Sequence, residues 1–392
     1  MRYLLVTLAL FFICSFLNAE KLWITIGENF LSSLKDDVPL EIASRNFDGI
    51  RLIKIDKKDF PQFITSMHRV CGRCPGFFHH QSKEEGLLEL NRGFTRDLAA
   101  KRIFVPYSIS EPDTVESFIG QVQEENIVAF LKTYSSFHTR YHRSEAVKEA
   151  MKWLKDYWTE LTRGRDDVEI KFFKHQSSPQ SSLILSIRGS EKPDKILVAG
   201  SHSDSISSSW GSANARAPGA DDNGSGIAVL SETLRILCEN DYRPKNTLQL
   251  MAYAAEEVGL RGSKEIARQY KQADKNVIGV LNLDMTNYPG SSIPIILTSD
   301  YTNHAQNEFL GKLIDRYLKL NWVYEKAGYA CSDHASWHSH GFPTTYPFES
   351  LDKDMNPNIH SNRDNLDVTG GRAEHSVHFT KIALAYLVEM TK

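Results

Sequence analysis

Acidic and imidazole side chains occur where hydrophobic segments end in the second half of this 392-residue chain. His202 and Asp204 follow "KILVAGS", Glu256 and Glu257 follow "NTLQLMAYAA", and Asp284 follows "NVIGVLNL". Imidazoles and carboxylates are ligands of Zn²⁺, and an aspartate at the end of a buried strand is costly unless it is paired or binds a metal. Singly, each motif is also typical of a salt-linked or surface residue. Together they predict a metal site.

The stretch "APGADDNGSG" places Asp221 and Asp222 before a glycine-rich turn, and His360 lies in "NPNIHSNRD". We predict that Asp222 is shared between two metal ions, because the glycines let the backbone come close and adjacent aspartates cannot both face one cleft. Asp221 then caps or orients, and a helix cap alone is the alternative for this pair. The set suits two Zn²⁺ ions. At roughly 3.5–4 Å apart, such ions activate a water and polarise a carbonyl together.

The segments that must position these residues alternate between strand and helix patterns. Strands are expected at 181–189, 195–202, 246–255 and 276–286, and helices at 114–137, 144–162, 224–240 and 263–273. This alternation predicts an α/β fold with a mixed, mostly parallel central sheet flanked by helices. In such folds, sites lie at the carboxyl ends of the strands.

Residues 20–112 differ from the rest and form a small α+β region with few side chains suited to chemistry. The strand-like pieces "KLWITIG", "IRLIKI" and "KRIFVPYSI" alternate there with charged turns. Cys71 and Cys74 form a C-x-x-C pair, which predicts a local disulfide in an oxidising compartment. The catalytic domain is expected at residues 113–392.

Residues 1–19 have the pattern of a secretory signal peptide. Arg2 precedes an apolar run from Leu4 to Leu17, and Ala19 provides a small residue before a cleavage site at Glu20. A retained membrane helix is the alternative, but the run is shorter than the ~20 residues that a span needs. We therefore expect a protein secreted to the extracellular space or periplasm, with no membrane segment after cleavage. The net charge of −3 gives no support for a nucleic-acid partner.

The chain resembles the secreted di-zinc aminopeptidases of the bacterial leucyl aminopeptidase type, in peptidase clan MH. The motifs that carry this resemblance, in the family's order, are "GSHSDS", "APGADDNGSG", "AAEEVGLRGS", "LNLDMT", "GYACSDHASWH" and "PFES…NPNIHSNRD". The resemblance implies a zinc-exopeptidase-like fold and peptide substrates with a free N-terminus. We also expect a monomer.

The resemblance also implies a role for each site residue. The family pattern implies that His202 and Asp284 bind one zinc ion and that Glu257 and His360 bind the other. Asp222 would bind both ions. Glu256 would be the general base, and Tyr329 would donate to the developing oxyanion. Asp204 would orient His202, with Ser332 as a further support.

Two features depart from the family pattern. Relatives pair the cysteine that matches Cys331 with one four residues earlier, where this chain has Ala327. Cys331 is then a thiol or is joined elsewhere, with Cys238 as the candidate. The pocket for the substrate side chain is apolar in leucine-preferring members, and here the matching residues are Met285, Tyr346, Phe348, Met355 and Ile359. Asp352 stands where an aromatic residue is expected; pointing inward it would attract Lys or Arg, and otherwise a hydrophobic preference, which we favour, remains.

Secreted members of this family often carry a propeptide that assists folding or restrains activity, and residues 20–112 are the candidate segment. The alternatives are a glutaminyl cyclase, which uses one zinc on the same fold, and a binding module that would have lost ligands. A serine hydrolase is a weaker alternative from Ser332, Asp333 and His334, because the chain has no G-x-S-x-G turn.

Overall fold

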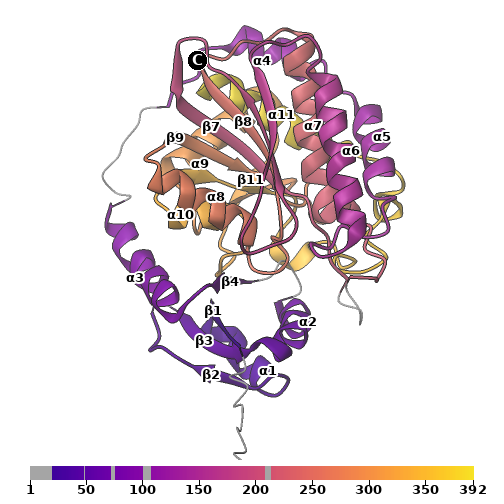
Figure 1. Cartoon of the computed structure of the whole chain (residues 1–392). Helices are drawn as coiled ribbons and strands as arrows, with labels where there is room; N and C mark the ends of the chain where they lie inside the picture. The colour runs from indigo at the N-terminus through magenta and orange to yellow at the C-terminus, as the bar shows by residue number, and fades with distance from the viewer. Residues whose placement is uncertain (1–19, 48, 72–75, 100–106, 208–212) are drawn as a thin grey trace, which may run out of the picture.

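The computed structural model describes residues 20–47, 49–71, 76–99, 107–207 and 213–392. A small N-terminal domain, drawn in indigo and purple in Figure 1, lies below a larger catalytic domain. The expected signal peptide at 1–19 is outside the described residues, as is Cys74 of the predicted Cys71–Cys74 disulfide. None of the described helices is both long and apolar enough to cross a membrane.

The N-terminal domain is a four-stranded antiparallel sheet, in the order β2-β3-β1-β4, with helices packed against it. Its elements are β1 (Lys21–Gly27), α1 (Leu31–Lys35), β2 (Leu40–Ile42), β3 (Ile50–Asp56), α2 (Phe60–Cys71), β4 (Phe77–His80) and α3 (Lys83–Ala99). Ile24 and Ile26 of β1 are buried with Ile53 and Ile55 of β3, because alternate residues of a strand share one face. The strands predicted at "KLWITIG" and "IRLIKI" are confirmed.

The third strand-like piece, "KRIFVPYSI", gives a different result. Its residues up to 106 are outside the described part of the chain, and 107–109 have no strand structure. Tyr107 and Ile109 instead pack against the core of the catalytic domain.

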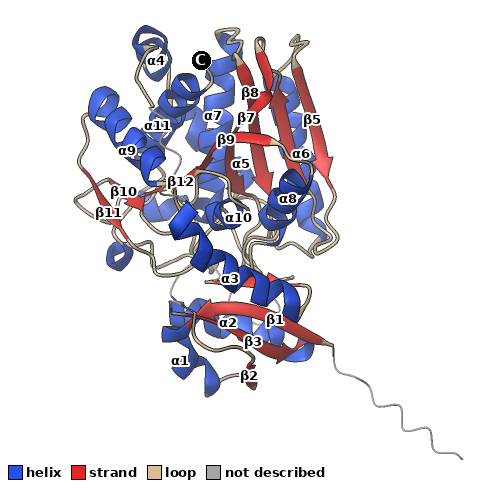
Figure 2. Ribbon diagram, turned by 90° about the vertical axis from the view of Figure 1, so that its left-hand side faces the viewer, coloured by secondary structure: helices blue, strands red, loops and turns tan. Residues whose placement is uncertain are grey.

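The catalytic domain is built on a six-stranded sheet in the order β12-β9-β7-β8-β6-β5. Its strands are β5 (Val168–Phe173), β6 (Ser182–Ile187), β7 (Lys192–His202), β8 (Asn246–Tyr253), β9 (Asn276–Asn282) and β12 (Thr344–Thr345). Strands β12, β9, β7 and β8 are parallel, whereas β6 is antiparallel to β8 and β5 to β6. The predicted mixed, mostly parallel sheet between helices is confirmed (Figure 2).

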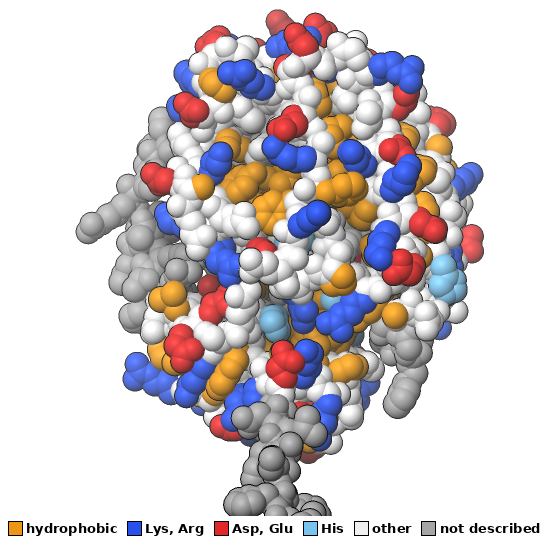
Figure 3. Space-filling view, in the orientation of Figure 1, with side chains coloured by type: hydrophobic (Ala, Val, Ile, Leu, Met, Phe, Trp, Pro, Cys, Tyr) orange, Lys and Arg blue, Asp and Glu red, His pale blue; other side chains and the backbone are white. Residues whose placement is uncertain are grey.

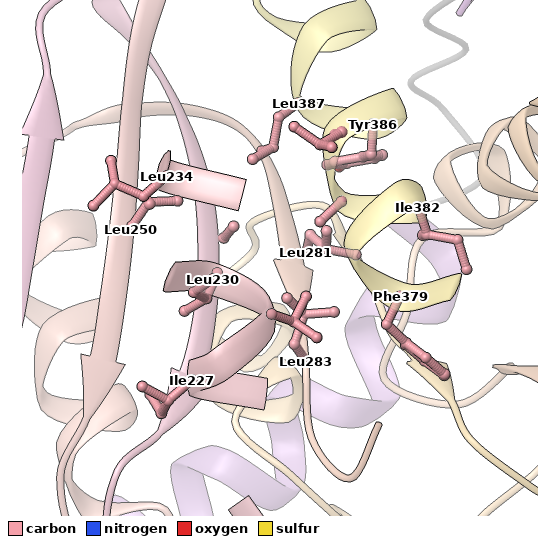
Figure 4. Close-up of a cluster of buried hydrophobic side chains, with 14 of the residues drawn as sticks. Ile227, Leu230, Leu234, Leu250, Leu281, Leu283, Phe379, Ile382, Tyr386 and Leu387 are labelled. Carbon is pink, nitrogen blue, oxygen red and sulfur yellow. The ribbon is translucent and has the colours of Figure 1, made fainter. Parts of the chain in front are cut away.

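Helices cover both faces of this sheet. They are α4 (Pro112–Ile119), α5 (Glu124–Tyr134), α6 (Glu145–Leu161), α7 (Gly226–Glu239), α8 (Arg261–Gln272), α9 (His304–Leu313), α10 (His334–Ser339) and α11 (Glu374–Met390). Leu281 of β9 faces the larger core with Leu230 of α7 and Phe379 of α11 (Figure 4). Leu197 of β7 belongs to the same core. Val198, one residue along β7, faces the opposite core beside α8 and α10.

The helix predicted at 114–137 is two helices, and this part of the prediction is wrong. Helix α4 ends at Ile119 and α5 starts at Glu124. Between them the backbone N–H of Gln123 donates to Glu232 of α7 at 2.9 Å, so a tertiary contact replaces a helical hydrogen bond. A second small sheet, β11 (Trp322–Glu325), β10 (Ile295–Thr298) and β13 (Pro347–Phe348), was also not predicted.

Cys238 and Cys331 belong to different parts of the catalytic domain and form no disulfide with each other. Cys238 of α7 packs beside the large core. Cys331 belongs to the core that the two domains share. The candidate Cys238–Cys331 pairing is therefore wrong.

One buried cation supports the turn that follows β7. Arg140 is fully buried and donates to the carbonyl oxygens of Ser203 at 3.0 Å and Gly219 at 2.7 Å. It also donates to Pro218, and its guanidinium lies 4.4 Å from the ring centre of Tyr134. Arg140 thereby joins the end of β7 to the start of the Asp221–Asp222 turn.

Arg140→Met should lower the free energy of unfolding by about 3 kcal/mol, because three buried carbonyl groups each lose a donor worth roughly 1 kcal/mol. Denaturant titration followed by tryptophan fluorescence measures the change. Lys148→Met is the control, since Lys148 is exposed and pairs with Glu145 on its own helix; it should change stability by less than about 0.5 kcal/mol. A loss below about 1 kcal/mol for Arg140→Met would contradict this role.

Candidate metal centre

The six acidic and imidazole residues expected at the site meet at the carboxyl edge of the sheet. His202 is the last residue of β7, the Glu256–Glu257 pair follows β8, and Asp284 follows β9. Parallel strands bring their carboxyl ends to one edge, so the direction of the strands alone brings these side chains together.

The other two come from loops. Asp222 lies in the irregular turn Ala220–Ser225 before α7, where the Asp222–Asn223 peptide bond is cis. His360 lies between β13 and α11 with φ of 54°.

Asp222 lies between the two imidazoles. Its Oδ1 is 3.0 Å from Nε2 of His202, and its Oδ2 is 2.9 Å from Nε2 of His360. His202 Nε2 is also 3.2 Å from Oδ1 of Asp284, and His360 Nε2 is 3.1 Å from Oε2 of Glu257. The five residues therefore form two groups that share one carboxylate.

The cluster is buried and rich in carboxylate oxygens. Apart from the imidazole contacts, the oxygens of Asp222 and Glu257 have no hydrogen-bond partner among the described residues, and neither do those of Glu256. Carboxylates buried in this way are costly unless a cation or a proton compensates them. Three of these residues, His202, Asp222 and Glu257, lie close enough together to hold one metal ion. The donor set of imidazole and carboxylate without thiolate fits a divalent cation.

The pKa shifts within the cluster also favour a bound cation. Burial, and then the charge of Asp222, raises the pKa of Glu257 to about 7. Burial lowers the pKa of His360, but the charge of Glu257 and the hydrogen bond to Asp222 outweigh it and raise the value to about 10. Burial, chiefly, holds the pKa of Glu256 well above its ordinary range. Without a metal the cluster retains protons, and a divalent cation would displace them.

Asp204 and Ser332, the two residues expected to support the ligands, contact residues of the cluster. Nδ1 of His202 is 3.2 Å from the backbone oxygen of Asp204 and 3.7 Å from its Oδ1. The carboxylate of Asp204 also accepts the backbone N–H groups of Glu256 at 3.1 Å and Glu257 at 3.3 Å. Ser332 donates its hydroxyl to Asp284 Oδ2 at 2.6 Å. Asp204 therefore links the loops after β7 and β8.

Asp221 does not face the cluster. Its carboxylate accepts the backbone N–H of Asn287 at 3.0 Å and the side-chain amide of Asn356 at 2.9 Å. The backbone N–H groups of Asp221 and Asp222 donate in turn to Asp364 at 3.1 and 3.0 Å. Asp221 and Asp364 thus hold the turn from both sides, a role that the sequence suggested only for Asp221.

Comparisons with known proteins agree with this geometry. Residues 182–385 match the family described as "Peptidase family M28". A probable aminopeptidase of Saccharomyces cerevisiae, YDR415C, is 36% identical over 293 residues, which are 73% of this chain and 78% of the relative.

The chain belongs to peptidase family M28.

Leucine aminopeptidase 1 of Arthroderma gypseum is 33% identical over 314 residues, covering 76% of this M28 chain and 83% of the relative. The crystal structure of the LapA aminopeptidase of Legionella pneumophila has a TM-score of 0.81 at 25% identity and covers 95% of this chain and 99% of that one. With such coverage the likeness includes the N-terminal domain. The protein is a metallo-aminopeptidase.

A cavity open to solvent, with about 430 Å³ of empty space, borders the candidate metal centre of this M28 chain. Tyr346 is in its wall, and the hydroxyl of this residue donates to the backbone oxygen of Asp284 at 3.3 Å. Of the six residues expected to form the side-chain pocket, five line the cavity: Met285, Tyr346, Phe348, Asp352 and Met355. Ile359 is buried but does not line it.

The cavity also contains residues that the sequence did not identify. Ile296 and Thr298 of β10 and Glu325 of β11 line it. Glu325 accepts the backbone N–H of Asp352 at 2.9 Å. These residues belong to the small sheet, so no strand-end motif marked them.

The N-terminal domain packs over this site. Phe77 of β4 shares one core with Ala255 and Val258 from the loop after β8. The ring of Phe30 meets the ring of Tyr329 edge to face, with centroids 5.7 Å apart. His68 of α2 contacts His360, with 2.7 Å between their Nδ1 atoms. The sequence carried no signal for His68, because only the packing of the two domains brings it to the site.

The serine-hydrolase alternative does not fit the geometry. Ser332 donates to Asp284 and accepts from Asn282 at 2.8 Å, so its hydroxyl is engaged away from any imidazole in the described contacts. Burial lowers the pKa of His334 to about 3. Ser332 therefore has no adjacent base of the kind that a triad needs.

Gly219→Ala should displace Asp222 and weaken metal retention. Gly219 has φ of 52°, and a Cβ there would lie 2.5 Å from the backbone oxygen of Asp222. Gly164→Ala is the control, because Gly164 also has a positive φ, of 85°, but nothing lies within 4 Å of a Cβ there. Both variants bear a backbone strain of about 1–2 kcal/mol. We expect only Gly219→Ala to lose metal during dialysis against a weak chelator, and equal retention in the two would contradict the prediction.

Proposed function

We propose that this M28 metallo-aminopeptidase is a secreted, monomeric enzyme with two zinc ions that removes N-terminal residues from peptides. The observation that carries the two-metal proposal is the position of Asp222, whose two oxygens each lie about 3 Å from a different imidazole. His202 and Asp284 would hold one ion, Glu257 and His360 the other, and Asp222 both. When bound, zinc supplies the Lewis acid that activates water and polarises the scissile carbonyl.

Glu256 is the general base of the proposed reaction. Its Oε2 lies 3.9 Å from Nε2 of His202, beside the ligands, while its backbone is held by Asp204. A carboxylate with a raised pKa takes a proton from the attacking water and passes it to the leaving amine more readily than an ordinary glutamate does. Tyr329, at the edge of the cavity, would donate its hydroxyl to the developing oxyanion.

Glu256→Gln should keep the zinc content of the wild type but lower turnover by about 10²- to 10⁴-fold, the usual contribution of a general base. Hydrolysis of an aminoacyl nitroanilide measures the rate, and metal analysis of the same sample measures zinc. Glu239→Gln, which changes an exposed glutamate of α7, should leave both values unchanged. A Glu256→Gln enzyme with a near-normal rate would exclude Glu256 as the base.

For the side chain of the substrate, we propose that the cavity accepts leucine-like residues and also Lys and Arg. Met285, Phe348 and Met355 provide apolar walls for an aliphatic stem, whereas Glu325 and Asp352 add two carboxylates to the same lining. Leucine aminopeptidase 1 of Arthroderma gypseum supports the hydrophobic preference by its name. The acidic residues support the basic one.

A variant that combines Glu325→Gln with Asp352→Asn should separate the two preferences. We expect kcat/KM for a lysyl substrate to fall at least about tenfold, since a close charge pair is lost. The value for a leucyl substrate should stay within about threefold. Glu160→Gln on the exposed face of α6 is the control. An unchanged ratio of lysyl to leucyl hydrolysis would mean that the carboxylates do not face the substrate side chain.

We further propose that residues 1–19 are a signal peptide and that the N-terminal domain, within residues 20–112, acts as a propeptide that assists folding or restrains activity. Its contacts with Tyr329 and His360 support this role. On the face in Figure 3, basic and acidic side chains are interspersed, which supports peptide rather than nucleic-acid partners.

A single-zinc glutaminyl cyclase is the second candidate. Metal analysis of the purified chain, together with assays for amine release and for cyclisation of an N-terminal glutamine, distinguishes the two. One tightly bound zinc with cyclisation and no peptide hydrolysis would overturn the proposed function.

A further inference from the structure

One histidine of the metal centre has its outer nitrogen facing the other domain. His68 of α2 is buried, and its ring lies at 79° to that of His360 with centroids 4.0 Å apart. The Nδ1 atoms are 2.7 Å apart, which is hydrogen-bond distance. A bond between two ring nitrogens needs one donor and one acceptor.

The contacts of the other ring nitrogen of His360 show which of the two Nδ1 atoms is the donor and which is the acceptor. Its Nε2 faces Asp222 and Glu257, so Nε2 is the atom on the metal side. A neutral imidazole that gives Nε2 to a metal carries its proton on Nδ1. That proton points at His68, whose Nδ1 is then the acceptor.

The two imidazole ligands differ in which part of the chain supplies the group that faces their Nδ1 atom. Nδ1 of His202 faces Asp204, two residues away in its own loop. Asp364, near His360 in sequence, instead accepts backbone N–H groups of the Asp221–Asp222 turn. His360 itself lies outside helix and strand with a positive φ, so no regular element directs its ring.

We propose that His68 is a positioning residue of the metal centre, supplied by the N-terminal domain, that holds His360 in the orientation and tautomer needed to bind zinc. This inference rests on the proposed two-zinc function. Groups that accept the outer N–H of a metal-binding histidine typically change metal affinity by about 10- to 100-fold.

The proposal makes the two metal positions unequal. The His202–Asp284 side is supported within the catalytic domain, whereas the Glu257–His360 side depends on the docked N-terminal domain. Because linkage is reciprocal, zinc on that side strengthens docking of α2 by the same factor by which His68 strengthens zinc binding.

Competition with a chromophoric chelator on the full-length chain tests this. We expect wild type to bind two zinc ions and His68→Leu to bind one with unchanged affinity and the second about 10- to 100-fold more weakly. His68→Asn should restore part of the loss, because its amide oxygen accepts a hydrogen bond. Zinc should raise the thermal unfolding temperature of His68→Leu less than that of the wild type.

His80→Leu is the matched control. His80 is an equally buried histidine of the same domain, but it contacts Thr25 at 2.9 Å and Lys264 at 2.8 Å rather than a ligand. Both zinc affinities should be unchanged in this variant. An equal loss in His80→Leu would overturn the proposal by showing a general effect of weaker docking.

Two further results would overturn the proposal. One is a folded His68→Leu with both affinities unchanged. The other is an altered visible spectrum of the fully cobalt-loaded variant, which would make His68 a direct ligand. If His68→Leu does not fold, His68→Ala takes its place. A wild type that binds fewer than two zinc ions would instead contradict the proposed function, so the two failures are distinct.

Discussion

The mutual repulsion of carboxylates buried at one edge of the sheet is the constraint on which this site depends. Asp222, Glu256, Glu257 and Asp284 are withdrawn from water and share two imidazoles. Such a group is stable only with protons or cations among its oxygens. The surrounding structure therefore provides contacts that keep these side chains together, including the backbone N–H groups that Asp204 accepts after β8.

Much of the catalytic fold could be predicted from local pattern. The buried part of β7 and most of β9 are continuous apolar runs, and α7, the helix after the Asp221–Asp222 turn, is apolar over most of its length and almost wholly buried. The break between α4 and α5 could not be predicted, because it depends on Glu232, more than 100 residues later in the chain. The small sheet of β10, β11 and β13 has strands of two to four residues, too short for periodicity to identify.

The candidate site also contains some residues that could be predicted from the sequence and others that could not. Strand-end residues such as His202 and Asp284 were predictable, since chain direction alone places them at one edge. Asp352 was predicted for the cavity, but its neighbour Glu325 was not, because the two meet through a hydrogen bond from the backbone N–H of Asp352 to the side-chain carboxylate of a distant segment. His68 was beyond prediction for a stronger reason: its position depends on how one domain packs on another, and no spacing in the sequence encodes that.

Packing of the two domains provides the support that the proposed role of the small domain at the metal centre requires. Phe77, Ala255 and Val258 share one apolar core, so separating the domains would expose hydrophobic surface on both. On the other side of the interface, Lys264 of α8 donates to the backbone oxygen of His79 at 2.9 Å and lies 3.0 Å from Glu85. The interface therefore has both apolar and charged contacts. A hydrogen bond to His360 formed on such a support is directional, because the residue that makes it is held by a packed helix rather than by a mobile chain end.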